Sequence, residues 1–177
     1  MGKIVGGGLP VGAFGGREEV MALTEPRRPG FLPHSGTFNG NAATTAAGAA
    51  ALELLTAEEC MRLNALGERL RDGIRELGDE LGLAVTATGL GSLLTMHLVD
   101  GPVENYRDAR RADREAVRLL HLALLNEGVF SARRGMLSLS TPMGEAEIER
   151  ALAAVRRALL AVGAERPLPV RAVVAAP

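Results

Sequence analysis

A long amphipathic pattern in the middle of the chain constrains its fold most. Between Ala57 and Gly82, large aliphatic residues recur every three or four positions, which is the spacing of one face of an α-helix. Thr56 and Glu59 have the spacing of a capping box, and Gly82 is suited to end the helix. The stripe that predicts a buried helix face consists of Leu63, Leu66, Leu70, Ile74, Leu77 and Leu81.

Beyond this helix, strand and helix patterns alternate. Two apolar runs at 83–87 and 92–99 predict a pair of strands, with Gly89 and Gly91 in the turn between them. The later elements expected are a charged helix at 108–127, a hairpin of strands 129–132 and 136–140, and a helix at 145–162 that ends at Gly163. We therefore expect a compact α+β layer with a small, mainly antiparallel sheet that is covered by helices.

The first 56 residues have a different composition. A glycine-dense segment at 4–16 predicts a loop or strand-turn, and a second loop occupies 34–41. The alanine-rich stretch 42–55 predicts a helix that is small on most faces and lets a neighbouring backbone approach closely. We expect three parts, which are 1–56, 57–163 and a loose tail at 164–177.

Charge and composition exclude several classes of protein. The 20 basic and 21 acidic residues leave no excess of positive charge for nucleic acid. A single cysteine, Cys60, excludes an intrachain disulfide and suits a reducing cytoplasm. No signal peptide or membrane-spanning run is visible, and no His, Cys and carboxylate spacing fits zinc. We expect a soluble cytoplasmic protein with no nucleic-acid, membrane or metal partner.

Lys3 is the only lysine among the 20 basic residues, and all the others are arginines. A lysine amine can lose its proton and condense with a carbonyl, whereas a guanidinium effectively cannot. Lys3 also precedes the densest glycine run, where a backbone can approach a ligand closely. The exception therefore indicates a reactive amine; chance survival of one lysine in an arginine-biased sequence is the alternative.

Two glycine-containing segments are candidates for a phosphate-binding loop. The run Gly6 to Gly12 matches neither GxGxxG nor GxxxxGK[ST], so a nucleotide fold is not predicted. The loop around Gly36 and Thr37 places hydroxyls and backbone amides directly before a helix, which suits a phosphate. An ordinary helix entry with Asn41 as N-cap is the alternative.

Several segments, in order, carry a family resemblance. The segment GKIVGGGLPVGAFGG at 2–16 is similar to the region around the cofactor lysine of class III aminotransferases, and SGTFNGN at 35–41 resembles the next signature. Further matching segments lie at 88–92, 100–102 and 134–141. The resemblance covers nearly the whole chain except its tail, and within the family it is closest to glutamate-1-semialdehyde 2,1-aminomutase.

The resemblance implies an α/β chain that is the C-terminal part of a fold-type I pyridoxal 5′-phosphate (PLP) transferase. Residues 1–56 would be a remnant of the large cofactor-binding domain, and 57–163 a connecting helix with the small α+β domain. Lys3 would form the internal aldimine and shuttle a proton. Gly36 and Thr37 would reach the cofactor phosphate of the other subunit of a homodimer. The substrates implied are an amino donor and a keto or semialdehyde molecule.

The sequence also departs from the family pattern. It begins at the lysine, so the upstream carboxylate, phosphate cradle and stacking aromatic are absent, and we expect little activity without a complementary N-terminal half. The segment after Val129 lacks the longer insert associated with aminomutases, which favours an aminotransferase. Ala42 replaces the usual proline. The alternative is a non-catalytic interaction module or truncated pseudoenzyme that binds an aminotransferase-like partner.

The remaining candidates have two interpretations each. His34 lies near the Thr37 loop and is a weaker candidate for the phosphate, whereas His97 is interpreted as a core residue and His121 as a surface residue. Arg133 or Arg134 could bind a substrate carboxylate or be an ordinary turn residue. A solvated helix face, rather than an anion site, is expected for the cluster Arg107, Arg110, Arg111, Arg114 and Arg118.

Overall fold

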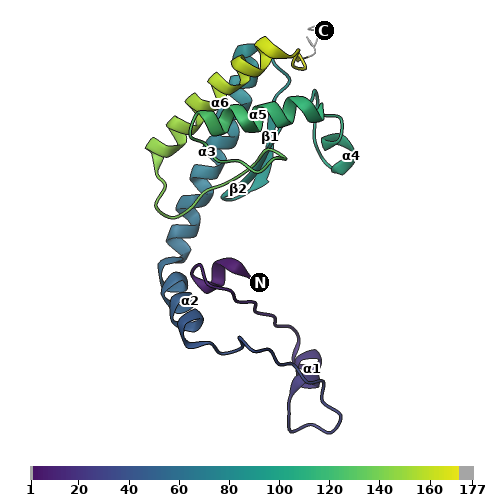
Figure 1. Ribbon diagram of the computed structural model, residues 1–177, viewed down its shortest axis with the longest axis vertical. Coiled ribbons are helices and arrows are strands. Elements are labelled where there is room, and N and C mark those ends of the chain that lie inside the picture. The colour runs from purple at the N-terminus through teal and green to yellow at the C-terminus, as the bar shows by residue number, and fades with distance from the viewer. Residues whose placement is uncertain (1, 172–177) are drawn as a thin grey trace. The chain divides into compact units, whose positions relative to one another are not determined.

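The computed structural model describes residues 2–171, with Lys3 described by its backbone alone (Figure 1). The chain divides into two compact units, the first ending at Ala57 and the second beginning at Glu58. Among the described residues, every buried apolar side chain lies between Leu63 and Leu168. The apolar core therefore belongs to the second unit.

The second unit contains a three-stranded antiparallel sheet in the order β1-β2-β3. Its strands are β1 (Thr86–Leu90), β2 (Leu93–His97) and β3 (Met136–Ser138). In the register, Thr88 lies opposite Thr95, and Leu94 lies opposite both Gly89 and Leu137. This confirms the small antiparallel sheet that the sequence predicted.

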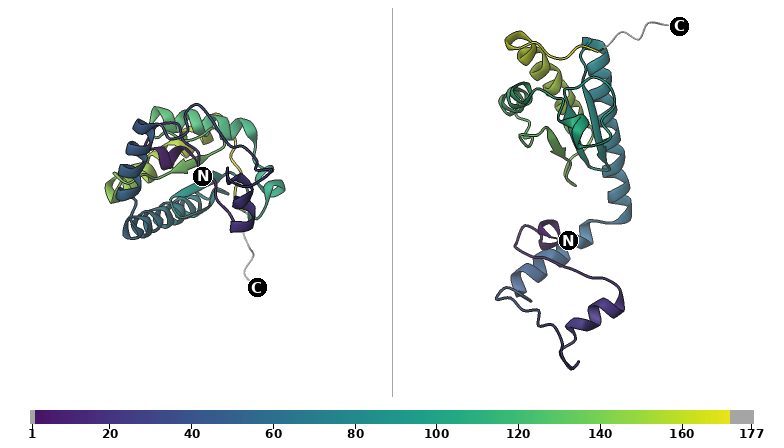
Figure 2. Two further views of the ribbon diagram at one scale, coloured as in Figure 1. Left: turned by 90° about the horizontal axis from the view of Figure 1, so that it is seen from below. Right: turned by 90° about the vertical axis from the view of Figure 1, so that its right-hand side faces the viewer.

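Three long helices pack with the sheet around one core (Figure 2). They are α3 (Ala57–Leu81), α5 (Arg114–Asn126) and α6 (Glu145–Glu165). The predicted stripe is buried from Leu63 to Leu77, and α6 buries its own row of apolar residues. Period-3.6 patterning thus identified the buried helix faces correctly. No helix within residues 2–171 is long and apolar enough to cross a membrane.

Helix α3 lies in close backbone contact with the β1–β2 turn. A Cβ atom on Gly67 would lie 2.1 Å from the carbonyl oxygen of Gly91, so only glycine fits there. The buried Arg71 donates from Nη1 to the same oxygen at 2.7 Å, and Arg75 donates from Nη2 to the carbonyl of Ala87 at 2.7 Å. One arginine of α3 therefore satisfies a carbonyl of the edge strand β1, and another satisfies a carbonyl of the turn that follows it.

Two details of the predicted sheet were wrong. Gly89 is not in the turn but inside β1, at φ 157°, and the turn is made at Gly91, at φ 56°. The segment 129–132 is not a strand, because β3 pairs with β2 instead. Ala132 only closes the tight turn before β3, through its N–H bond to the carbonyl of Met136 at 2.8 Å.

The helix predicted at 108–127 is interrupted. Asn105 and Asp108 form a capping box for α4 (Tyr106–Ala109), and Asp113 caps α5 by accepting the N–H of Glu115. Each polar side chain offers the backbone a helix start, so two helices form in place of one.

The C-terminal boundary also differs from the prediction. Helix α6 continues through Gly163 to Glu165. Residues 166–171 are not a loose tail, since Leu168 is buried and the carbonyl of Pro169 accepts the N–H of Ala84 at 2.7 Å. An isolated antiparallel bridge joins Leu83 to Val170. The rest of the predicted tail, 172–177, lies outside the described residues.

The first unit is built from short elements: η1 (Lys3–Gly6), α1 (Glu18–Met21), η2 (Ala22–Thr24) and α2 (Ala42–Leu54). The predicted alanine-rich helix therefore forms within one residue of its expected range. Asn41 caps it, with Oδ1 accepting the N–H of Thr44 at 3.1 Å. Thr44 and Gly48 are its buried residues.

Candidate functional site

The backbone of Lys3 begins a tight reversal of the chain. Lys3 starts η1, which is one turn of 3-10 helix. The turn ends at Gly7, which takes a left-handed conformation, at φ 57°, and donates its N–H to the carbonyl of Ile4 at 3.2 Å. The chain then returns, and Gly2 and Gly12 form an antiparallel bridge. Glycine tolerates the positive φ that this turn requires.

The glycine segment packs directly on the backbone of α2. A Cβ atom on Gly7 would lie 2.3 Å from the carbonyl oxygen of Ala47, and one on Gly48 would lie 2.4 Å from the carbonyl oxygen of Val5. The predicted close approach to α2 is thus confirmed, and the approaching neighbour is the segment that begins at Lys3. These two contacts, at Val5 and at Gly7, hold the turn that Lys3 begins against the backbone of α2.

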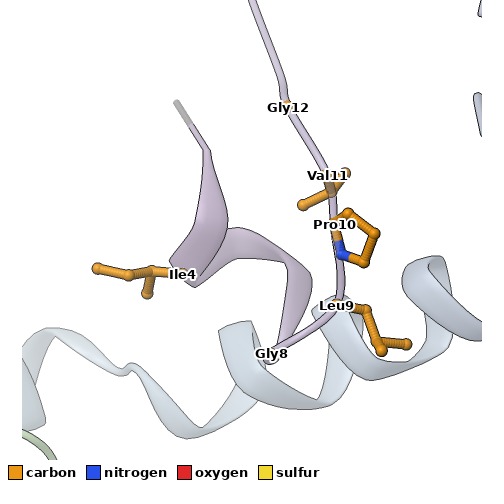
Figure 3. A pocket seen from close by; sticks show the side chains of 6 residues that line it. All are labelled: Ile4, Gly8, Leu9, Pro10, Val11 and Gly12. Atoms are coloured by element: carbon orange, nitrogen blue, oxygen red, sulfur yellow. The ribbon is translucent and has the colours of Figure 1, made fainter.

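A shallow hollow adjoins this turn (Figure 3). It is lined by Ile4 and by residues 8–12, and none of these carries an ionisable side chain. The side chain of Ile4, which is 76% exposed, points away from the returning segment. The hollow offers apolar contacts and backbone groups to whatever covers it.

The loop that contains Gly36 and Thr37 forms two overlapping turns before α2. Asn39 donates its N–H to the carbonyl of Gly36 at 3.0 Å, and Asn41 donates to the carbonyl of Phe38 at 3.2 Å. Within the described part of the chain, the exposed Thr37 makes no hydrogen bond through its hydroxyl or its N–H, and the N–H of Phe38 is also unused. One hydroxyl and two amides are therefore available to an oxyanion.

The structure places the Lys3 and Thr37 segments at different points of α2. Thr37 precedes the N-cap Asn41, whereas the Lys3 segment contacts α2 at Ala47 and Gly48. At 1.5 Å per residue, the N-cap Asn41 and the contact at Ala47 are about 9 Å apart along the helix axis. The two predicted site residues are thus attached to one helix but not to the same turn of it.

Gly48 permits the close packing of the Lys3 segment on α2, and the sequence pattern did not single it out. An isolated glycine inside an otherwise alanine-rich helix costs about 1 kcal/mol relative to alanine, so it signals a packing requirement. Its neighbour could not be named in advance, because Val5 lies 43 residues earlier in the chain.

The histidines are engaged within the protein. The ring of His34 lies edge-on to Phe14, with centroids 4.6 Å apart, and its role at a phosphate stays a prediction. His97 Nε2 lies 2.9 Å from Thr88 Oγ1, and burial lowers the pKa of His97, in agreement with a core histidine. His121 is only partly exposed, because Nδ1 lies 3.2 Å from the buried Ser131 Oγ.

The predicted carboxylate-binding candidates are exposed. Arg133 and Arg134 occupy the turn before β3, and Arg134 Nη2 lies 3.2 Å from the sulfur of Met136. In residues 2–171, no three His, Cys, Asp or Glu side chains are placed to hold a metal ion.

Comparison with known proteins matches most of the chain to one group. The sequence model of class-III aminotransferases matches residues 1–158. The beta-phenylalanine transaminase of Variovorax paradoxus is 46% identical over 88% of this chain and 36% of its own length. The glutamate-1-semialdehyde 2,1-aminomutase of Thermus thermophilus is 38% identical over 90% of this chain and 38% of its own length.

Solved structures share the fold described above. A beta-phenylalanine aminotransferase from Variovorax paradoxus superimposes with a TM-score of 0.89 at 43% identity, over 97% of this chain and 40% of that one. A transaminase solved with PLP bound gives a TM-score of 0.82 at 36% identity, over 93% of this chain and 38% of that one. The chain thus spans a little over a third of the relatives it matches. Because the family model matches residues 1–158, the chain belongs to the class-III aminotransferase family.

Proposed function

We propose that this chain supplies the reactive lysine and part of the phosphate site of a PLP-dependent transaminase. The observation that carries the proposal is the position of Lys3, the only lysine, on a turn held against α2. The turn lies inside the segment that matches the family, and a transaminase with PLP bound is among the relatives.

The Thr37 loop fits the phosphate of the cofactor. Its free hydroxyl and amides stand directly before the N-terminus of α2, where backbone N–H groups and the helix dipole favour an anion. Gly36 keeps the loop compact, because a Cβ atom there would lie 3.1 Å from Asn39 Oδ1. The separation of this loop from the Lys3 segment along α2 is consistent with Thr37 serving the cofactor of a second copy.

Lys3 performs two tasks in the proposed reaction. Its amine would hold the cofactor by condensing with the cofactor's aldehyde, with release of water. The same amine, when free, would move a proton at the reacting substrate carbon as a general base and then as an acid. The bound cofactor supplies the electron sink for this chemistry.

Transamination is the form of the reaction that the comparisons favour. The named transaminase is 46% identical to the chain, and the named aminomutase is 38% identical. The turn before β3 is also short: Gly135 donates its N–H to the carbonyl of Ala132 at 2.8 Å, and only Arg133 and Arg134 lie between these two residues. We therefore propose transfer of an amino group from an amino-acid-type donor to a keto acceptor.

Covalent trapping tests the role of Lys3. The chain is co-produced with the portion of the beta-phenylalanine transaminase that it does not match, supplied with PLP, and reduced with borohydride. Peptide mass spectrometry should find the cofactor on Lys3, and Lys3→Arg should abolish the adduct while keeping the charge, since a guanidinium does not condense. An assembled protein with an adduct only at its partner segment, or with none, would refute the proposed function and favour a non-catalytic interaction module.

The phosphate contact has its own variant and control. Thr37→Ala should weaken retention of the cofactor by about 1.5 to 3 kcal/mol, because a hydrogen bond to a charged group is lost. Thr45→Ala is the control, since that hydroxyl donates within the helix to the carbonyl of Asn41 at 2.7 Å. Equal losses in the two variants, measured by equilibrium dialysis, would argue against a specific contact at Thr37.

A further inference from the structure

Two ring side chains join the segment that follows Lys3 to the loop that carries Thr37. The rings of Phe14 and His34 meet edge to face, with their centroids 4.6 Å apart and their planes at 74°. Residues 15–33, which contain α1 and η2, lie between the two rings in the sequence. The ring pair therefore closes this excursion of the chain where it begins and ends.

The ring pair is not part of an apolar core. Phe14 is 57% exposed, His34 is also exposed, and no apolar side chain of the first unit is buried among the described residues. In the described part of the chain, the imidazole of His34 forms no hydrogen bond and no ion pair. The contact with Phe14 is therefore what orients the imidazole, and it needs a reason other than filling a core.

The Phe14 side of the pair leads back to Lys3. Phe14 follows Gly12 by two residues, and Gly12 forms an antiparallel bridge to Gly2, the residue before Lys3. The turn that Lys3 begins is itself held against the backbone of α2. The ring of Phe14 thus belongs to a segment whose position is fixed close by.

The His34 side leads to the Thr37 loop. Thr37 follows His34 by three residues, which span about 11 Å at most when fully extended. The far end of the loop is fixed at Asn41, whose side chain accepts the N–H of Thr44 and caps α2. A loop that is held at both ends has fewer conformations to lose when it binds a ligand. The ring pair thus limits where the hydroxyl and the amides of this loop can lie.

We propose that Phe14 and His34 are positioning residues, whose ring contact holds the Thr37 loop in place for the cofactor phosphate. His34 acts through Phe14 and does not touch the phosphate, unlike the direct contact that the sequence suggested for it. The proposal rests on the proposed function, because the phosphate is the ligand for which the loop is held. It adds to that function two residues and a contact between segments that are distant in sequence.

Equilibrium dialysis of PLP from the assembled protein of the trapping experiment tests the ring contact. Phe14→Ala and His34→Ala should each weaken retention about two- to tenfold, which corresponds to the loss of one aromatic pair. The double variant should lose no more than either single variant, because both changes remove the same contact.

His34→Phe separates positioning from direct contact. This variant keeps an aromatic ring but loses the proton and the charge of the imidazole, so it should retain PLP to within about twofold of the unchanged protein. The ratio of the two should stay constant on both sides of the usual histidine pKa, about 6.5. A histidine that bound the phosphate through its protonated ring would make this ratio change with pH.

Phe31→Ala is the matched control. It removes the same kind of side chain from the excursion 15–33, but Phe31 forms no ring pair in the described part of the chain. We expect less than about a twofold effect on retention. Amide exchange in the assembled protein without PLP gives a second readout: the N–H of Asn39, bonded to the carbonyl of Gly36 at 3.0 Å, should exchange faster in Phe14→Ala and at the unchanged rate in His34→Phe.

Three results would overturn the proposal. They are a loss of PLP in His34→Phe as large as in His34→Ala, equal effects of Phe14→Ala and Phe31→Ala, and unchanged exchange at Asn39 in Phe14→Ala. If the unchanged protein neither retains PLP nor carries the adduct at Lys3, it is the proposed function that fails. Exchange at Asn39 alone then decides whether the ring pair holds the loop.

Discussion

Replacing Gly67 by alanine should destabilise the second unit, although alanine is the better helix former. In an unconstrained helix this change stabilises by about 1 kcal/mol. Here the new Cβ would lie 2.1 Å from the carbonyl oxygen of Gly91, whereas real Cβ contacts are essentially never below 3.0 Å. The helix and the turn must therefore separate by at least 0.9 Å, which is the difference between these two distances.

The cost of this separation has two parts. Overpacking of a tight contact costs about 1 to 3 kcal/mol. The bond from the buried Arg71 to the Gly91 carbonyl, at 2.7 Å, lengthens or breaks, and a hydrogen bond from a charged group contributes about 1.5 to 3 kcal/mol. After the helix gain is subtracted, we expect the free energy of unfolding to fall by roughly 1.5 to 5 kcal/mol.

Urea denaturation followed by circular dichroism measures this change. Gly163→Ala is the matched control, because Gly163 lies within α6 and its added Cβ would come no nearer than 3.8 Å to Leu168. This control should stabilise by about 0.5 to 1 kcal/mol. A double-mutant cycle with Arg71→Met should show coupling between Gly67 and Arg71. If Gly67→Ala stabilises the protein as Gly163→Ala does, the close contact is not present in solution.

Three further predictions follow from single contacts. Burial lowers the pKa of His97 below its usual 6.5. The neutral form therefore stabilises the fold above pH 6.5, and this contribution is lost as the pH falls from there through the folded-state pKa. His97→Gln should flatten that part of the curve of stability against pH. Asn41→Ala removes the N-cap of α2 and should cost about 1 kcal/mol, detected as faster amide exchange at Thr44. Leu168→Ala should lower the urea midpoint by an amount that corresponds to about 2 kcal/mol, whereas a loose C-terminal segment would leave it unchanged.

Local patterns predicted the fold where the decisive interactions are local. The stripe on α3 and the alanine composition of α2 identified both helices, because periodicity and propensity act within a few turns. The pairing of Leu83 with Val170 was missed, since the two residues are distant in sequence. The break near Asp113 was missed for another reason: a capping side chain competed with a continuous helical pattern.

The candidate site was predictable to a similar degree. Short signatures predict Lys3, Gly36 and Thr37 as site residues; the structure describes their backbone positions, and their roles stay predictions. The support of the Lys3 turn by Gly48 depends on a contact between distant segments.

The confinement of the apolar core to the second unit has a consequence for hydrogen exchange. Segments with few buried contacts open locally at low free energy, whereas core helices open only with global unfolding. Amide protons of α2 and of the turn after Lys3 should therefore exchange with deuterium well before those of α3 and α6. A ligand that orders the first unit would slow only the fast-exchanging set, so cofactor loading could be followed by exchange alone, against an internal standard that the same chain provides.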